Sequence, residues 1–140
     1  MKSNELMIGD WVIHTQTIDR YLNILEEPIK VYARVESILE DGINQDNCQG
    51  CDDYVEIESV DPIPLTEEIL KANGFEWYSH EYVYWQDEDG REPPFRIFRN
   101  SQGVLRISVA YKLVRLRYVH ELQHALRLCG LSDLANNFKI

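Results

Sequence analysis

The sequence predicts an α+β protein with an N-terminal SH3-like small β-barrel or curled antiparallel sheet, followed by a helix, an antiparallel β-meander and a C-terminal helix. Three observations predict this order: short alternating segments before residue 62, a Pro-Ile-Pro connector at 62–64, and a helical apolar stripe within residues 117–129. An apolar fraction of 44% in 140 residues is enough for one core or for two small ones that share an interface.

The first half carries the strand signals. Residues 10–14, 29–39 and 54–60 have the alternation or the β-branched content of strands. Asp41-Gly42 is a strong hairpin signal, because both residues tolerate the positive φ of a type I′ turn. The residues expected to face inward on the second strand are Val31, Ala33, Val35 and Ile38. These elements predict a barrel-like domain at 1–64.

The second half begins with a stiff connector and a helix. Pro62 and Pro64 end the first sheet, since proline lacks the backbone donor that a ladder needs. Thr66 is the expected N-cap of the helix, acidic residues occupy its first turn, and Gly74 is the expected C′ residue.

A meander and a final helix complete the chain. The expected strands are residues 76–86, 95–99 and 104–111. The last helix covers 117–129 and stops at Gly130, which leaves 131–140 as a short tail. Residues 65–140 would then form a second domain of α-β-β-β-α order, with one continuous compact unit as the alternative.

Charge is distributed unevenly along the chain. The formal net charge is −10, and residues 1–65 carry 4 basic against 14 acidic side chains, whereas residues 66–140 carry 10 of each. The acidic excess repels nucleic acid at long range and suggests two halves with different surfaces.

Compartment signals favour the cytoplasm. The apolar runs last only a few residues and the N-terminus lacks a signal-peptide pattern, so no membrane partner is expected. Three cysteines, an odd number, fit a reducing compartment.

Four segments form a pattern in a fixed order along the chain. They are residues 4–12 (Asn-Glu-Leu-Met-Ile-Gly-Asp-Trp-Val), Gly42-Ile43-Asn44, residues 62–70 (Pro-Ile-Pro-Leu-Thr-Glu-Glu-Ile-Leu) with Gly74-Phe75, and residues 118–123 (Tyr-Val-His-Glu-Leu-Gln). In this pattern the chain resembles a family of small uncharacterised proteins encoded by gut anaerobic bacteria and their phages. It departs from that family in a longer insertion at 14–28 and in the loop at 48–51. The resemblance implies a fold and an accessory role in phage or mobile-element biology, and no activity.

Residues 120–124 (His-Glu-Leu-Gln-His) match the zinc-peptidase string, in which two histidines one helical turn apart bind the metal and the glutamate activates its water. On an ideal helix, His120 and His124 point about 160° away from the apolar stripe. We therefore expect an exposed polar face here, and the neighbouring Arg127 disfavours a cation. In the resembling family this helix carries amides at the positions of Glu121 and His124, which implies that the string is incidental.

Cys48 and Cys51 have the spacing of a zinc knuckle or a redox pair. A second close cysteine pair is missing, and the flanking carboxylates of Asp46, Asp52 and Asp53 disfavour a thiolate. The favoured interpretation is a loop with two free thiols, with adventitious metal binding as the alternative.

Residues 93–120 contain no acidic residue. Their basic residues are Arg96, Arg99, Arg106, Lys112, Arg115 and Arg117. Interleaved with Phe95, Phe98 and Tyr111, they could track a phosphate backbone and stack bases. The same residues could instead dock against the acidic first half or form the solvated face of a sheet.

Together these observations predict a non-catalytic protein that binds another protein and needs no cofactor. A homodimer is left open. The alternatives are a nucleic-acid-associated small barrel that uses residues 93–120, and a zinc hydrolase that uses His120, Glu121 and His124.

Overall fold

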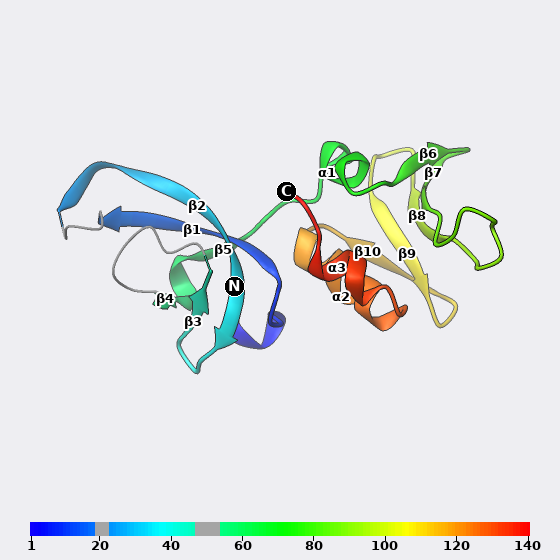
Figure 1. Cartoon of the computed structure of the whole chain (residues 1–140). Coiled ribbons are helices and arrows are strands. Elements are labelled where there is room, and N and C mark those ends of the chain that lie inside the picture. The colour runs from blue at the N-terminus through cyan, green and yellow to red at the C-terminus, as the bar shows by residue number, and fades with distance from the viewer. Residues whose placement is uncertain (19–22, 47–53) are drawn as a thin grey trace.

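Two five-stranded antiparallel sheets make up most of the structure (Figure 1). The computed structural model describes residues 1–18, 23–46 and 54–140. The first sheet is built from strands within 11–62 and the second from strands within 76–116. In Figure 1 the two sheets lie at opposite ends of the molecule, and the C-terminal helices lie between them.

The first sheet is curled, as predicted. Its strands are β1 (Trp11–Ile18), β2 (Ile24–Ile38), β3 (Gly42–Gln45), β4 (Tyr54–Glu56) and β5 (Val60–Pro62), in the spatial order β4-β3-β2-β1-β5. Two 3-10 turns accompany them, η1 (Ser3–Glu5) and η2 (Ile57–Ser59). The prediction of one strand at 54–60 was wrong, because η2 interrupts it. The small core of this half consists of Leu6, Val12, Val35, Ile43 and Val60.

The inward-facing residues of β2 are largely as predicted. Val31, Ala33 and Val35 are buried, whereas Ile38 is exposed. The hairpin between β2 and β3 is present, but Gly42 does not adopt the positive φ of the expected turn. A Cβ atom at Gly42 would lie 2.5 Å from the Val55 carbonyl oxygen, so glycine is required there by the close approach of β4.

The connector and the first helix follow the prediction. The Ile69 amide donates a hydrogen bond of 3.3 Å to Thr66 Oγ1, which caps α1 (Glu67–Ala72). Gly74 follows with a φ of +83°, a conformation that favours glycine at the end of a helix.

The second sheet has five strands where three were predicted. They are β6 (Glu76–Tyr78), β7 (Glu81–Tyr84), β8 (Phe95–Arg99), β9 (Leu105–Val109) and β10 (Lys112–Leu116), in the order β10-β9-β8-β7-β6. The predicted strand at 76–86 is a hairpin that turns at Ser79 and His80, and β10 follows a turn at Ala110 and Tyr111. All four turn residues have positive φ, which glycine and asparagine usually supply, so neither place carries a turn signal in the sequence.

Two helices close the chain. They are α2 (Val119–Leu128) and α3 (Ser132–Asn136), so the expected tail at 131–140 is instead partly helical. The helices and the inner face of the second sheet form the main core, which includes Phe75, Tyr82, Ile97, Leu122, Leu126 and Phe138. Ile13 and Ile63 join this core, so it draws on residues from both halves. Within residues 1–18, 23–46 and 54–140, every helix is too short or too polar to cross a lipid bilayer.

Candidate functional site: a groove at the junction of the two halves

Asp10 lies at the junction of the two halves and is fully buried. Its Oδ1 accepts a hydrogen bond of 2.6 Å from Arg127 Nη1, and its Oδ2 accepts one of 2.8 Å from the Met7 amide. The same Oδ2 lies 2.6 Å from His124 Nε2. A buried carboxylate is tolerated only when it is paired and hydrogen-bonded. This cluster therefore ties the start of β1 to α2.

Gln123 makes a second connection between the same elements and is also fully buried. Its Oε1 accepts a hydrogen bond of 2.9 Å from the Trp11 amide, and its Nε2 donates to the carbonyl oxygens of Gly9 at 3.1 Å and Ala135 at 2.8 Å. One side chain thus joins β1, α2 and α3, and it satisfies backbone groups that burial would otherwise leave unpaired.

The expectation of an exposed polar face on α2 was wrong. His120 is only 6% exposed, and the side chain of His124 is 26% exposed and faces Asp10. Burial lowers the pKa of His120 below its ordinary value. The helical projection failed because it assumed that protein covers only one side of the helix, whereas the first half of the chain covers the other side.

The residues of the zinc-peptidase string are engaged in structural contacts. Glu121 Oε2 accepts hydrogen bonds from the amides of Arg117 at 2.6 Å and Tyr118 at 3.1 Å, which closes the first turn of α2. The ring centroids of His120 and His124 are 5.7 Å apart, and His124 Nε2 is already engaged in a hydrogen bond with Asp10 Oδ2. In the part of the chain that the structure describes, no three His, Cys, Asp or Glu side chains are arranged to hold a metal ion.

A polar cavity of about 480 Å³ lies beside these histidines. Its lining residues are Met1, Glu5, Pro62, Arg117, Tyr118, His120, Glu121 and His124. The Tyr118 and His120 rings are stacked with a centroid distance of 5.8 Å, which holds the His120 ring in place. Within the described chain, His120 Nδ1 has no hydrogen-bond partner.

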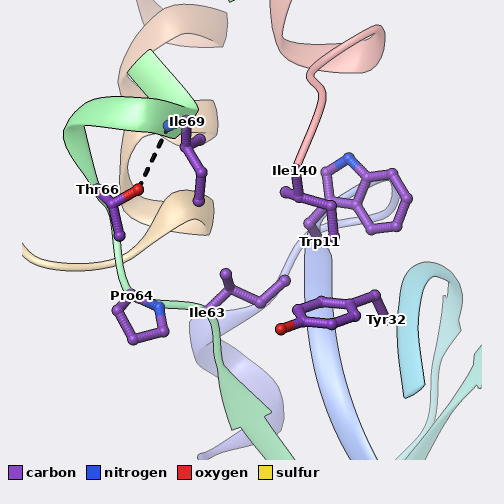
Figure 2. Close-up of a pocket in the computed structure, with 7 residues that line it drawn as sticks. All are labelled: Trp11, Tyr32, Ile63, Pro64, Thr66, Ile69 and Ile140. Carbon is purple, nitrogen blue, oxygen red and sulfur yellow. Dashed lines mark hydrogen bonds between the residues drawn. The ribbon is translucent and has the colours of Figure 1, made fainter. Parts of the chain in front are cut away.

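An apolar groove of about 630 Å³ lies at the same junction (Figure 2). Its lining residues are Trp11, Tyr32, Ile63, Pro64, Thr66, Ile69 and Ile140. Figure 2 shows the Trp11 and Tyr32 rings on one side and Thr66 and Ile69 on the other, with Ile63 between them. Strands β1 and β2, the connector, α1 and the C-terminal segment all contribute.

The Trp11 wall of this groove is held at several points. The Trp11 Nε1–H donates a hydrogen bond of 2.7 Å to the Phe138 carbonyl oxygen, and the Arg34 guanidinium lies 4.8 Å from the centre of the indole ring. Arg34 is held in turn, since its Nη1 donates to the Asn136 carbonyl oxygen at 2.6 Å. The groove is therefore formed before any ligand arrives.

The six basic residues of 93–120 are divided among several places. Those on the outer face of the second sheet, away from the main core, are Arg96, Arg106 and Arg115. Arg99 pairs with Glu67 on α1 at 2.6 Å, and Arg117 Nε lies 3.9 Å from Glu121. Lys112 begins β10 and is exposed. The basic surface that the nucleic-acid alternative requires is thus reduced to three arginines, one of which, Arg96, pairs with Glu81 at 2.7 Å.

Cys48 and Cys51 lie outside the described residues. Cys129, at the C-terminal end of α2, is exposed and free.

Sequence reasoning missed Asp10, Gln123 and the groove. A single acidic residue before a strand and a single glutamine in a helix are ordinary surface residues in a sequence, and nothing marks them as buried. The one available signal for the groove was the run of apolar and proline residues in the connector, which the sequence analysis treated only as a spacer.

Comparison with family models, with curated proteins and with solved structures finds no match to this chain. Its function is therefore argued from its own residues.

Proposed function

We propose that the protein is a non-catalytic module that binds another protein, and that the groove receives an apolar segment of that partner. The observation that carries the proposal is the lining of the groove, which is apolar apart from the Tyr32 phenol and the Thr66 hydroxyl. Concave apolar surfaces with few polar groups are the usual receptors for apolar ligand groups.

The chemistry of the lining supports binding over catalysis. Acid-base and nucleophilic catalysis need an ionisable or activated side chain beside the reacting atoms. No carboxylate, imidazole, thiol or amine side chain is among the groove residues. The Thr66 hydroxyl already accepts the Ile69 amide as the cap of α1, so it is committed to the fold.

The rigidity of the groove supports the same proposal. A wall that is fixed in advance loses little conformational entropy when a partner docks, and aromatic residues in such walls often dominate binding energy. Trp11 is fixed by Gln123, Phe138 and Arg34, and Tyr32 is 49% exposed beside it.

The setting of this role is proposed on sequence grounds. The resemblance to proteins of gut anaerobes and their phages suggests an accessory protein of phage or mobile-element origin. The odd number of cysteines suggests a reducing compartment, and we propose that the protein acts in the cytoplasm.

Selection from a random peptide library on the immobilised protein tests the proposal. We expect enrichment of peptides that carry a bulky aliphatic or aromatic residue. We also expect Tyr32→Ala to weaken their binding by roughly tenfold, because it removes an aromatic wall of the groove.

Tyr111→Ala is the matched control. Tyr111 is fully exposed at the turn before β10, far from the groove lining, so the same substitution there should leave peptide affinity unchanged. Sedimentation equilibrium on both variants separates partner binding from a homodimer. Peptides bound equally by the wild type and by Tyr32→Ala would contradict the proposal, as would enrichment of charged peptides alone.

A further inference from the structure

Three neighbouring side chains, Phe98, Arg106 and Arg115, lie in a row on the outer face of the second sheet. The same row continues to Glu81 on β7, which is directly opposite Phe98 and pairs with Arg96. Phe98 on β8 is directly opposite Arg106 on β9, and Arg106 is directly opposite Arg115 on β10. Neighbours in such a row are about 5 Å apart. Phe98 is 39% exposed, and both arginines are exposed. An aromatic ring and two cations therefore share one solvent-facing line.

Among the residues that the structure describes, no acidic side chain pairs with Arg106 or Arg115. Arg96 pairs with Glu81 at 2.7 Å and Arg99 pairs with Glu67 at 2.6 Å. By contrast, Arg106 and Arg115 form no ion pair and no side-chain hydrogen bond with the residues at 1–18, 23–46 and 54–140.

The close approach of these two arginines favours the binding of an anion between them. Like charges directly opposite each other on neighbouring strands destabilise a sheet. An anion between the two guanidinium groups would remove this repulsion, and guanidinium binds phosphate through paired hydrogen bonds.

We propose that this outer face binds single-stranded nucleic acid, with a phosphate at Arg106 and Arg115 and a base stacked on Phe98. A groove or face that combines cations for the backbone with an aromatic ring for the bases is the usual device for binding single strands without sequence preference. Leu113 lies beside this row on β10 and is 59% exposed, which extends the apolar area available to a second base.

The net charge of the protein sets the conditions for this binding. The excess of −10 resides in residues 1–65, whereas residues 93–120 contain no acidic side chain. The acidic half opposes a polyanion at long range, and the arginine row attracts it at contact. Binding should therefore be weak and should decrease as the salt concentration rises.

The ring distinguishes a single strand from other polyanions. Bases in a duplex are stacked on one another and offer no free face, so Phe98 could not contribute. An acidic protein segment would neutralise the arginines and leave the Phe98 ring unused.

Fluorescence anisotropy with labelled oligothymidylate and oligouridylate of about 15 nucleotides tests the proposal. The wild-type protein should bind both at low salt. A single phosphate held by the two arginines predicts that affinity falls roughly 1.6-fold for each doubling of the salt concentration.

Matched variants separate the row from general charge. The double variant Arg106→Ala, Arg115→Ala should weaken binding by roughly tenfold or more. Arg99→Ala removes one positive charge from the same sequence segment, but Arg99 pairs with Glu67, so it should leave affinity nearly unchanged. Phe98→Leu keeps apolar bulk and removes the ring, and should weaken binding by about fivefold or more. Thermal melts of each variant confirm that the sheet is intact.

Three results would overturn the proposal: no binding of either oligonucleotide at low salt, equal binding by the double variant, or unchanged binding by Phe98→Leu together with competition by oligoglutamate. The last result would assign the face to an acidic protein. Tyr32→Ala should not affect oligonucleotide binding, so failure here is distinct from failure of the groove proposal.

Discussion

Two faces of α2 pack against the rest of the protein, one through apolar contacts and the other through hydrogen bonds. One face places Leu122 and Leu126 in the main core, where they have no exposed surface. The opposite face presents Gln123 and His124 to the first half of the chain, where hydrogen bonds fix them to Trp11 and Asp10. Apolar contact stabilises the fold without much directional demand. Hydrogen bonds set where β1 lies relative to the helix, and so they position the Trp11 wall of the groove.

A substitution on the apolar face of α2 should give the largest loss of stability. Leu126→Ala is expected to lower the free energy of unfolding by about 4 kcal/mol, since it removes a fully buried side chain and leaves a cavity. Urea unfolding measures the effect. Leu128→Ala on the same helix is the control: Leu128 is 82% exposed, and the change there should stay within about 0.5 kcal/mol.

A substitution in the charged cluster on the polar face of α2 should lower stability nearly as much. Asp10→Ala leaves Arg127 and His124 without their shared acceptor, and we expect a loss of about 3 kcal/mol in the free energy of unfolding. Asp89→Ala breaks a solvent-exposed pair with Arg91 and should change stability by less than about 1 kcal/mol. Equal effects for the two variants would mean that burial of Asp10 contributes nothing.

Gln123→Leu tests the hydrogen bonds of the polar face at nearly constant volume. It removes the acceptor of the Trp11 amide and the donor to two carbonyl oxygens, and we expect a loss of about 2 kcal/mol. Peptide binding in the groove should weaken as well, because Trp11 loses one of its fixed points. A stable variant with unchanged peptide affinity would show that the groove does not depend on α2.

A change of pH should have the smallest effect on the free energy of unfolding. Burial lowers the pKa of both His14 and His120 in the folded protein. The unfolded chain then binds protons more readily than the folded one, so the free energy of unfolding falls as the pH drops below about 6.5. Urea unfolding at pH about 7.5 and about 5.5 measures this fall. His120→Gln should make it smaller, and a fall of the same size would assign the acid sensitivity elsewhere.

Much of the fold could be predicted from local signals. The Thr66 cap, the Gly74 terminator and the buried positions of β2 depend on residues close in sequence, and these predictions are confirmed except at Ile38, which is exposed. The missed β6–β7 and β9–β10 hairpins turn at residues that rarely adopt positive φ. Tertiary pairing of the strands overrides that preference, and no local pattern reports it.

The candidate site was less predictable than the fold. The groove gathers residues from β1, the connector and the C-terminal segment, and its lining spans positions 11 to 140. The buried role of Gln123 depends on a partner more than 100 residues away in the chain. The outer-face row was partly predictable, because alternation along β9 put Arg106 opposite the apolar residues. Only the register showed that Arg115 and Phe98 flank it.

Methyl NMR of the isoleucine-labelled protein, titrated with the selected peptide, tests the central claim most directly. We predict that shifts concentrate on Ile63, Ile69 and Ile140, which line the groove, while Ile97 and Ile107 within the second sheet change little. Shifts centred on Ile24 or Ile29, exposed on β2, with Ile63 and Ile69 unmoved would contradict the claim that the groove is the binding site.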